Sequence, residues 1–180
     1  ITGRAKDLII RGGHNIDPQL IEQVLNRHPA VALAAAVGCP DTHAGELPVA
    51  FVQLRPGQQA TADELLTFCR QHIAERAATP VEVWLDLPLP LTAMGKIFKP
   101  ALRLEAARRV FAREVAKLQE AGIDAHVHVQ ADPTHGTLVK IVVHASGGLS
   151  REDIQSRCRQ QLGGYQLKHE VVYAEPQEIS

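Results

Sequence analysis

The hydrophobic pattern predicts a hairpin followed by a helix in the first part of the chain. Two short extended runs within residues 7–16, DLII and HNI, flank an RGG turn. Asp17 and Pro18 begin a helix, because aspartate can cap the first turn and proline is tolerated at the first helical position. This helix has one apolar face and ends before Pro29.

Strand-like apolar runs follow at residues 31–38 and 47–54, and the stretch between them, CPDTHAGE, is predicted to be a loop. Thr61 and Glu64 have the spacing of a capping box, which predicts a helix to about Arg76. A third strand, VEVWLDLP, and the loop LPLTAMGKIFKP come next. The sequence then predicts a long helix that begins at Pro100 and ends at Gly122.

The remaining sequence predicts a second ββαβ unit: strands DAHVHVQA and TLVKIVVH, a capped helix SREDIQSRCRQQL, and a strand HEVVYAEP. We interpret it as an internal duplication of the preceding unit. The alternative is that any two ββαβ units share caps and apolar spacing. The matched positions are Thr42, His43 and Gly45 with Thr134, His135 and Gly136 across a short gap, Thr61 with Ser150, Cys69 with Cys158, and Glu82-Val83 with Glu170-Val171.

These elements predict an α+β fold with two domains, residues 1–120 and 121–180. The second unit lacks the glycine turn before the first helix and any counterpart of the Gly95-Lys96 loop, so we do not expect it to duplicate chemistry. The chain begins with ITGRAKDL and no initiator methionine, which predicts that it is part of a longer protein.

Composition narrows the function classes. The net charge of −1 gives no bulk attraction to nucleic acid or to an acidic membrane surface. No stretch approaches the roughly 20 apolar residues that span a bilayer. The 3 cysteines include no CxxC pair, which favours a reducing, cytoplasmic location over a disulfide framework.

Lys96, in the Gly-Lys pair at the centre of LPLTAMGKIFKP, is the first candidate for chemistry. It is either a solvated surface cation or a lysine delivered to an anionic substrate. A P-loop would need glycine at position 90 and Ser or Thr at position 97, where this chain has Pro90 and Ile97. The P-loop interpretation therefore fails.

Three ordered motifs resemble the mobile C-terminal domain of AMP-forming acyl-CoA synthetases: TGRAKDLIIRGGHNIDPQLIE, VGCPDTHAGELPVAFV and LPLTAMGKIFKPALR. The adenylate-forming family also includes luciferases and the adenylation domains of peptide synthetases. Lys6-Asp7 after GRA, and GKIFK in place of GKVDR, favour a CoA ligase. The resemblance implies that residues 1–120 form a small lid domain, with a β-hairpin and a three-stranded sheet flanked by helices, and that residues 121–180 are an extension.

The implied reaction has two steps. A carboxylic acid attacks the α-phosphate of ATP to give an acyl-adenylate and pyrophosphate, and the CoA thiol then displaces AMP. In this family the C-terminal domain rotates between the steps. ATP, Mg²⁺ and the acid would bind mainly to an N-terminal adenylation domain missing from this sequence, so we expect this fragment alone to be inactive; fatty, aryl and short-chain acids all remain open as substrates.

Lys96 corresponds to the family's adenylation lysine, and Gly95 and Pro90 would shape its loop. A lysine that bridges carboxylate and phosphate offsets their repulsion and stabilises the transition state. The context P-x-x-x-x-G-K also resembles one in which related bacterial CoA ligases are acetylated, so a lysine acetyltransferase is a candidate partner.

The resemblance assigns four further residues. Lys6 falls at the hinge, Arg4 at a position that contacts the nucleotide, and Gly12 and Gly13 at the turn that lines the CoA tunnel. The simpler alternatives are an exposed lysine, a surface ion pair and a plain hairpin turn. Glu22 follows the family pattern but is left out of the site as a helix surface residue.

Other interpretations stay open. The chain could be a non-catalytic interaction module, or part of an adenylation domain that acts on a carrier protein. His126 and His128, with His144 or His135, could bind zinc, although a polar strand face is the simpler interpretation. The helical arginines are either a solvated face or a docking site for a CoA phosphate; they are Arg103, Arg108, Arg109 and Arg113.

Overall fold

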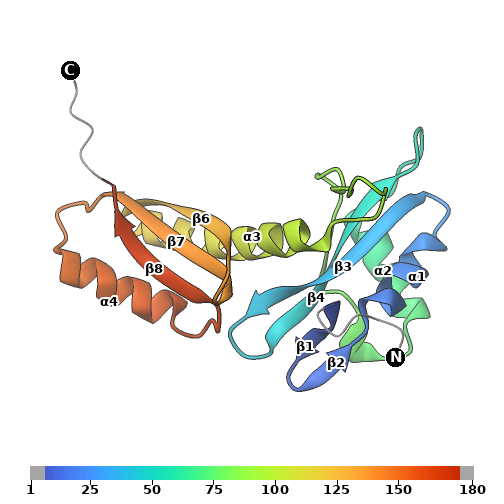
Figure 1. Cartoon of the computed structure of the whole chain (residues 1–180), viewed down its shortest axis with the longest axis horizontal. Helices are drawn as coiled ribbons and strands as arrows, with labels where there is room; N and C mark the ends of the chain where they lie inside the picture. The colour runs from blue at the N-terminus through green and yellow to red at the C-terminus, as the bar shows by residue number, and fades with distance from the viewer. Residues whose placement is uncertain (1–6, 175–180) are drawn as a thin grey trace. The chain divides into compact units, whose positions relative to one another are not determined.

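The computed structural model describes residues 7–174, which form two compact units divided between Ala106 and Ala107, inside helix α3 (Lys99–Glu120) (Figure 1). We call the described residues up to Ala106 unit 1 and those from Ala107 unit 2. The sequence predicts a domain boundary at the end of this helix, and that boundary stays a prediction. The second half of α3 contributes Phe111, Val115 and Leu118 to the core of unit 2.

The elements of unit 1 are β1 (Ile9–Arg11), β2 (His14–Ile16), α1 (Pro18–Asn26), β3 (Val31–Asp41), β4 (Gly45–Leu54), α2 (Ala62–His72), the 3-10 helix η2 (Arg76–Ala78) and β5 (Glu82–Trp84). The strands form one five-stranded sheet with the order β2-β1-β4-β3, and β5 pairs in parallel with β4. The predicted hairpin and three-stranded sheet are therefore joined. Arg11 pairs with Gly45, and the Ile10 amide donates to Glu46 Oε2 at 2.9 Å.

Two of the predicted helix starts are confirmed by their caps, whereas α3 begins at Lys99, one residue before the predicted start at Pro100. Asp17 Oδ1 accepts from the Gln19 amide at 2.9 Å. The Thr61 amide donates to Glu64 Oε2 at 2.7 Å, and the Glu64 amide donates to Thr61 Oγ1 at 3.2 Å. These bonds satisfy donors that the first turn of a helix leaves without partners.

The predicted loop over residues 39–46 is wrong, because β3 and β4 extend into it and leave residues 42–44 as the turn. Asp41 Oδ1 accepts from the amides of His43 and Ala44 at 2.9 and 2.7 Å. The turn ends at Gly45, whose φ of 76° suits glycine. Both hydrogen bonds hold the pKa of Asp41 below its usual value.

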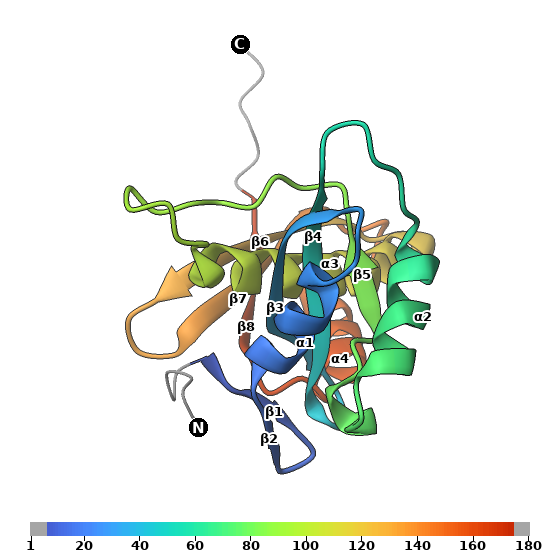
Figure 2. The same cartoon turned by 90° about the vertical axis from the view of Figure 1, so that its right-hand side faces the viewer.

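Both faces of the β3–β4 pair are buried. Helices α1 and α2 cover one face, where Ala34 and Val52 join the core (Figure 2). The other face carries Phe51, whose ring centroid lies 4.8 Å from that of Trp84. The start of α3 packs on this second face, because Cys39 Sγ contacts the carbonyl of Ala106 at 3.9 Å.

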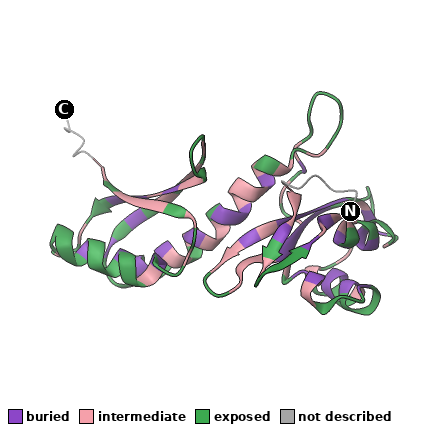
Figure 3. Cartoon of the chain, turned by 60° about the horizontal axis from the view of Figure 1, so that its bottom comes forward, coloured by how far each residue is buried: buried purple, intermediate pink, exposed green. Residues whose placement is uncertain are grey.

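Unit 2 has the same ββαβ order as the second part of unit 1: β6 (Asp124–Asp132), β7 (Gly136–Ala145), α4 (Arg151–Leu162) and β8 (Lys168–Tyr173). Strands β6 and β7 are antiparallel and β8 is parallel to β7, as β5 is to β4. Ile154, Cys158 and Leu162 are the buried positions of α4, which is otherwise mostly exposed (Figure 3).

The correspondence extends to individual turns and caps. Asp132 Oδ1 accepts from the amides of Thr134 and His135 at 2.9 and 2.7 Å, as Asp41 does in its own turn. The turns align through these aspartates without a gap, so Thr42 corresponds to Pro133 and not to Thr134 as the sequence comparison predicted. Two other predicted matches agree with the structure: Ser150 forms a capping box with Asp153, and Glu170 pairs with Lys140 as Glu82 does with Val49.

Candidate functional site

Lys96 lies on a closed hairpin that protrudes between β5 and α3. Leu91 and Ile97 form an antiparallel bridge, and the Thr92 amide donates to the Lys96 carbonyl at 2.7 Å. The turn is closed by the Gly95 amide, which donates to the Thr92 carbonyl at 2.8 Å, and Gly95 has a φ of 74°. A turn followed by a glycine at positive φ is a standard short hairpin connection. Lys96 is therefore held on an ordered turn.

The hairpin presents Lys96 together with apolar side chains. Lys96 is exposed, and within residues 7–174 its ammonium makes no hydrogen bond or ion pair. Met94 is 83% exposed, Leu91 54% and Phe98 46%. A cluster of exposed large apolar residues marks a surface that contacts another surface or a ligand. The loop thus combines a free cation with a surface suited to burial.

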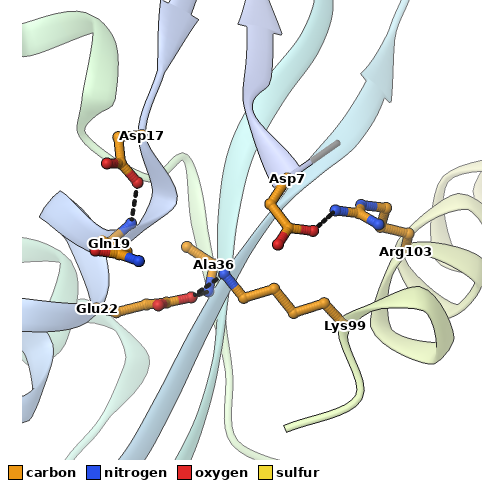
Figure 4. Close-up of polar contacts among 7 residues, drawn as sticks. All are labelled: Asp7, Asp17, Gln19, Glu22, Ala36, Lys99 and Arg103. Atoms are coloured by element: carbon orange, nitrogen blue, oxygen red, sulfur yellow. Dashed lines mark hydrogen bonds and ion pairs between the residues drawn. The ribbon is translucent and has the colours of Figure 1, made fainter. Parts of the chain in front are cut away.

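The base of the hairpin is closed by Pro90, whose carbonyl accepts from the Phe98 amide at 2.7 Å. Helix α3 begins at Lys99, directly after Phe98. Its ammonium lies 2.7 Å from Glu22 Oε1, and the same oxygen accepts from the Ala36 amide at 2.8 Å (Figure 4). Glu22 is therefore an internal contact of unit 1, whereas the sequence interpretation treated it as a helix surface residue.

A second ion pair joins α3 to Asp7, which precedes β1. Arg103 Nη2 lies 2.5 Å from Asp7 Oδ1 (Figure 4). The interpretation of Arg103 as part of a purely solvated helix face is therefore wrong, and the interpretation of this arginine as a CoA-phosphate ligand stays a prediction. Long-range pairs of this kind leave no local signal in the sequence, because each partner alone resembles an ordinary surface charge.

Gly12 and Gly13 form the β1–β2 turn, with φ values of 54° and 84°. The Gly12 amide donates to the Ala44 carbonyl at 2.8 Å, which places this turn beside the β3–β4 turn. A Cβ atom at either glycine would meet no atom within 4 Å, so the backbone here faces open space. Figures 1 and 2 show this turn and the loop between β5 and α3 on opposite sides of unit 1.

Two predicted site residues, Arg4 and Lys6, lie outside the described residues. Asp7, the first described residue, follows Lys6 directly and is held by Arg103. The structure thus places Lys96, Gly95 and Pro90 on one hairpin and the two glycines on another, and it does not bring the two groups together.

Two histidines of unit 2, His126 and His144, form a pair. His126 Nδ1 lies 2.6 Å from His144 Nε2. Across residues 7–174, no three His, Cys, Asp or Glu side chains are grouped so that they could hold a metal ion. The polar strand face remains the simpler interpretation of these histidines.

Cys69 and Cys158 are buried, as predicted, and burial raises the pKa of the Cys69 thiol to about 11. The pKa of Cys158 is raised for the same reason. A neutral, buried thiol is a poor nucleophile. Both cysteines are therefore core residues.

Comparison with known proteins supports the assignment of unit 1. Residues 20–96 match the family model of the AMP-binding enzyme C-terminal domain. The marinolic acid–CoA ligase of Pseudoalteromonas sp. (strain SANK 73390) is 45% identical over 162 residues, which cover 90% of this chain and 24% of that protein. The putative acyl-CoA synthetase YngI of Bacillus subtilis is 44% identical over 103 residues, covering 57% of this chain and 19% of the relative.

Solved structures give the same result. Apo MatB from Rhodopseudomonas palustris has a TM-score of 0.53 and 34% identity, and the match covers 56% of this chain and 20% of that one. The acyl-CoA synthetase of Brucella canis has a TM-score of 0.52 and 38% identity, over 58% of this chain and 20% of that one. The chain thus spans about a quarter or less of the relatives' length. No helix among residues 7–174 is long and apolar enough to cross a membrane.

Proposed function

Because residues 20–96 form an AMP-binding enzyme C-terminal domain of the kind that acyl-CoA ligases carry, we propose that this chain is the lid of an ATP-dependent, AMP-forming carboxylate–CoA ligase. The full-length enzyme would use ATP, CoA and a carboxylic acid in the cytoplasm. Its N-terminal adenylation domain would be the main partner of this chain and would hold Mg²⁺. Lys96 is the residue that the lid brings to the first step.

The chemistry of that step explains the need for a lysine. The carboxylate oxygen forms a bond to the α-phosphorus of ATP while the bond to pyrophosphate breaks. Two anions approach and negative charge builds on the phosphoryl oxygens, so a cation between them lowers the barrier. Lysine suits this role because its charge is compact and its stem flexible.

The observation that carries the proposal is the state of the Lys96 hairpin. Its ammonium is free among the described residues, its backbone is held by the Thr92 and Gly95 hydrogen bonds, and its apolar neighbours Met94 and Leu91 are exposed. These features suit an arm that is buried against a second domain during adenylation.

The second step would use the other side of unit 1. We assign Gly12 and Gly13 to the wall of the CoA tunnel, because glycine backbone allows a thin pantetheine chain to approach closely. Lys6 is the hinge whose backbone torsions change between the steps, and Arg4 contacts the nucleotide. The separation of the glycine turn from the Lys96 hairpin supports this division of labour (Figure 1).

The test is Lys96→Ala in the full-length ligase. Pyrophosphate release from ATP and acid should fall by about 100-fold or more, as expected for the loss of a group that stabilises transition-state charge. Lys140→Ala, which removes a cation from unit 2, is the matched control and should leave the rate unchanged. Acetylation of Lys96 by a lysine acetyltransferase should reproduce the Lys96→Ala result, because it removes the same charge.

A further inference from the structure

The Lys96 hairpin is attached to unit 1 through its two ends. On one side Leu89 is only 6% exposed, so the chain is anchored in the core just before Pro90. On the other side Phe98 closes the hairpin base and also accepts from the Ala101 amide at 3.2 Å, which starts α3. The direction in which the hairpin leaves unit 1 therefore depends on how the first turn of α3 is held.

Glu22 holds that turn. Its Oε1 accepts from both the Lys99 ammonium at 2.7 Å and the Ala36 amide at 2.8 Å, so one oxygen connects α1, β3 and α3 (Figure 4). The side chains of Lys99 and Glu22 are only 16% and 17% exposed. Strand β3 is at the edge of the sheet, and Glu22 provides its Ala36 amide with an acceptor that no neighbouring strand supplies.

We infer that Glu22 is a positioning residue for adenylation: through Lys99 it fixes the placement of Lys96. This inference rests on the proposed function. An ion pair that is largely removed from water is stronger than an exposed one, and its loss leaves the other charge poorly solvated. Lys99 would then leave its site and shift the hairpin base. Small displacements of a catalytic group are costly in rate.

The test uses Glu22→Gln in the full-length ligase, which retains an oxygen acceptor for the Ala36 amide and removes the charge. The kcat of adenylation should fall about tenfold with little change in the KM for ATP, because the affected interaction is made in the transition state. Thioester formation from supplied acyl-adenylate should be unchanged. Lys99→Met should have the same effect, Lys99→Arg should preserve most of the rate, and the double variant Glu22→Gln/Lys99→Met should be no worse than either single.

Thr61→Ala is the control for general instability, because it removes the N-cap of α2 in the same unit and leaves both partners of the Glu22–Lys99 ion pair in place. It should lower the Tm without separating the two half-reactions. Equal losses of both half-reactions in Glu22→Gln would overturn the inference, as would unchanged adenylation in a preparation where Lys96→Ala abolishes it. Failure of Lys96→Ala itself to reduce adenylation would instead overturn the proposed function.

Discussion

Units 1 and 2 share a ββαβ arrangement, strand register and turn geometry, but they bury their sheets differently. In unit 1 the second sheet face is apolar and buried beneath the start of α3. In unit 2 the corresponding positions are polar or partly exposed. The matched pairs, unit 1 first, are Ala35 and His126, Val37 and His128, Val49 and Lys140, Phe51 and Val142, and Trp84 and Val172.

Comparison of the two units distinguishes the shared ββαβ arrangement from the segments that carry the proposed catalytic residues. Unit 1 has the β1–β2 glycine hairpin and the Lys96 hairpin, and neither has a counterpart in unit 2 up to residue 174. Both carry the residues proposed to act in catalysis. The shared ββαβ arrangement therefore serves as a support, and unit 2 has the corresponding caps and turns without the two hairpins.

The largest effect is expected when side chains are exchanged between the second sheet face of unit 1 and the matching positions of unit 2. Val37 is 1% exposed. Val37→His should therefore destabilise unit 1 by about 2–4 kcal/mol, because the polar imidazole ring would be buried without hydrogen-bond partners. The reciprocal His128→Val is on an exposed position and should change stability by less than about 0.5 kcal/mol. Comparable losses from both exchanges would contradict the assignment of one face as covered and the other as solvated.

The buried cysteines allow each unit to be followed separately in that experiment. Cys69 and Cys158 occupy corresponding sites on α2 and α4 and are protected by burial. A thiol exposed by unfolding has a pKa of about 8.5 and reacts readily at pH 8. Val37→His should accelerate alkylation of Cys69, measured by peptide mass spectrometry, with little effect on Cys158.

The helix N-caps provide a test with a smaller expected loss of stability, and each unit has a capping box. Thr61→Ala and Ser150→Ala each remove an N-cap hydroxyl and should cost about 1 kcal/mol. Each loss should appear only in the unit that carries the change, as faster alkylation of Cys69 or of Cys158. If either cap variant accelerated both thiols equally, the two units would unfold together and the comparison would need revision.

The smallest expected effect is on acid stability. Backbone amides of the turns, chiefly those of Ala44 and His135, hold the pKa values of Asp41 and Asp132 below the usual value. A lowered pKa in the folded state adds stability above the unfolded value of about 3.9, and this stability is lost as the pH falls through the folded pKa. Asp41→Asn and Asp132→Asn should each slightly reduce the loss of stability between pH 5 and pH 2, measured by urea unfolding. An unchanged acid profile in both variants would contradict this origin.

Local signals in the sequence predicted most of the elements. The caps at Asp17, Thr61 and Ser150 are short-range features, so they identify helix starts without knowledge of the tertiary fold. The burial of Cys69 and Cys158 followed from the apolar faces of their helices. The loop prediction at residues 39–46 failed because Asp41 shortens the turn, which apolar periodicity does not reveal.

Long-range contacts were not predictable from the same signals. The pairs Glu22–Lys99 and Asp7–Arg103 form only when α3 returns to the start of unit 1. Periodicity likewise identifies α3 as amphipathic without indicating that its first turns cover the second face of the β3–β4 pair. The proposed roles of Lys96 and of the glycine turn came from the resemblance to a family, and their geometry came from the structure.

The central claim is that the hairpin added to unit 1 acts in one half of the reaction. The most direct measurement is the ratio of the two half-reaction rates in one preparation of the Lys96→Ala full-length ligase: pyrophosphate release from ATP and acid, and thioester formation from supplied acyl-adenylate. We expect this ratio to fall by about 100-fold or more relative to the unmodified enzyme. An unchanged ratio, with both rates reduced together or both retained, would contradict the claim.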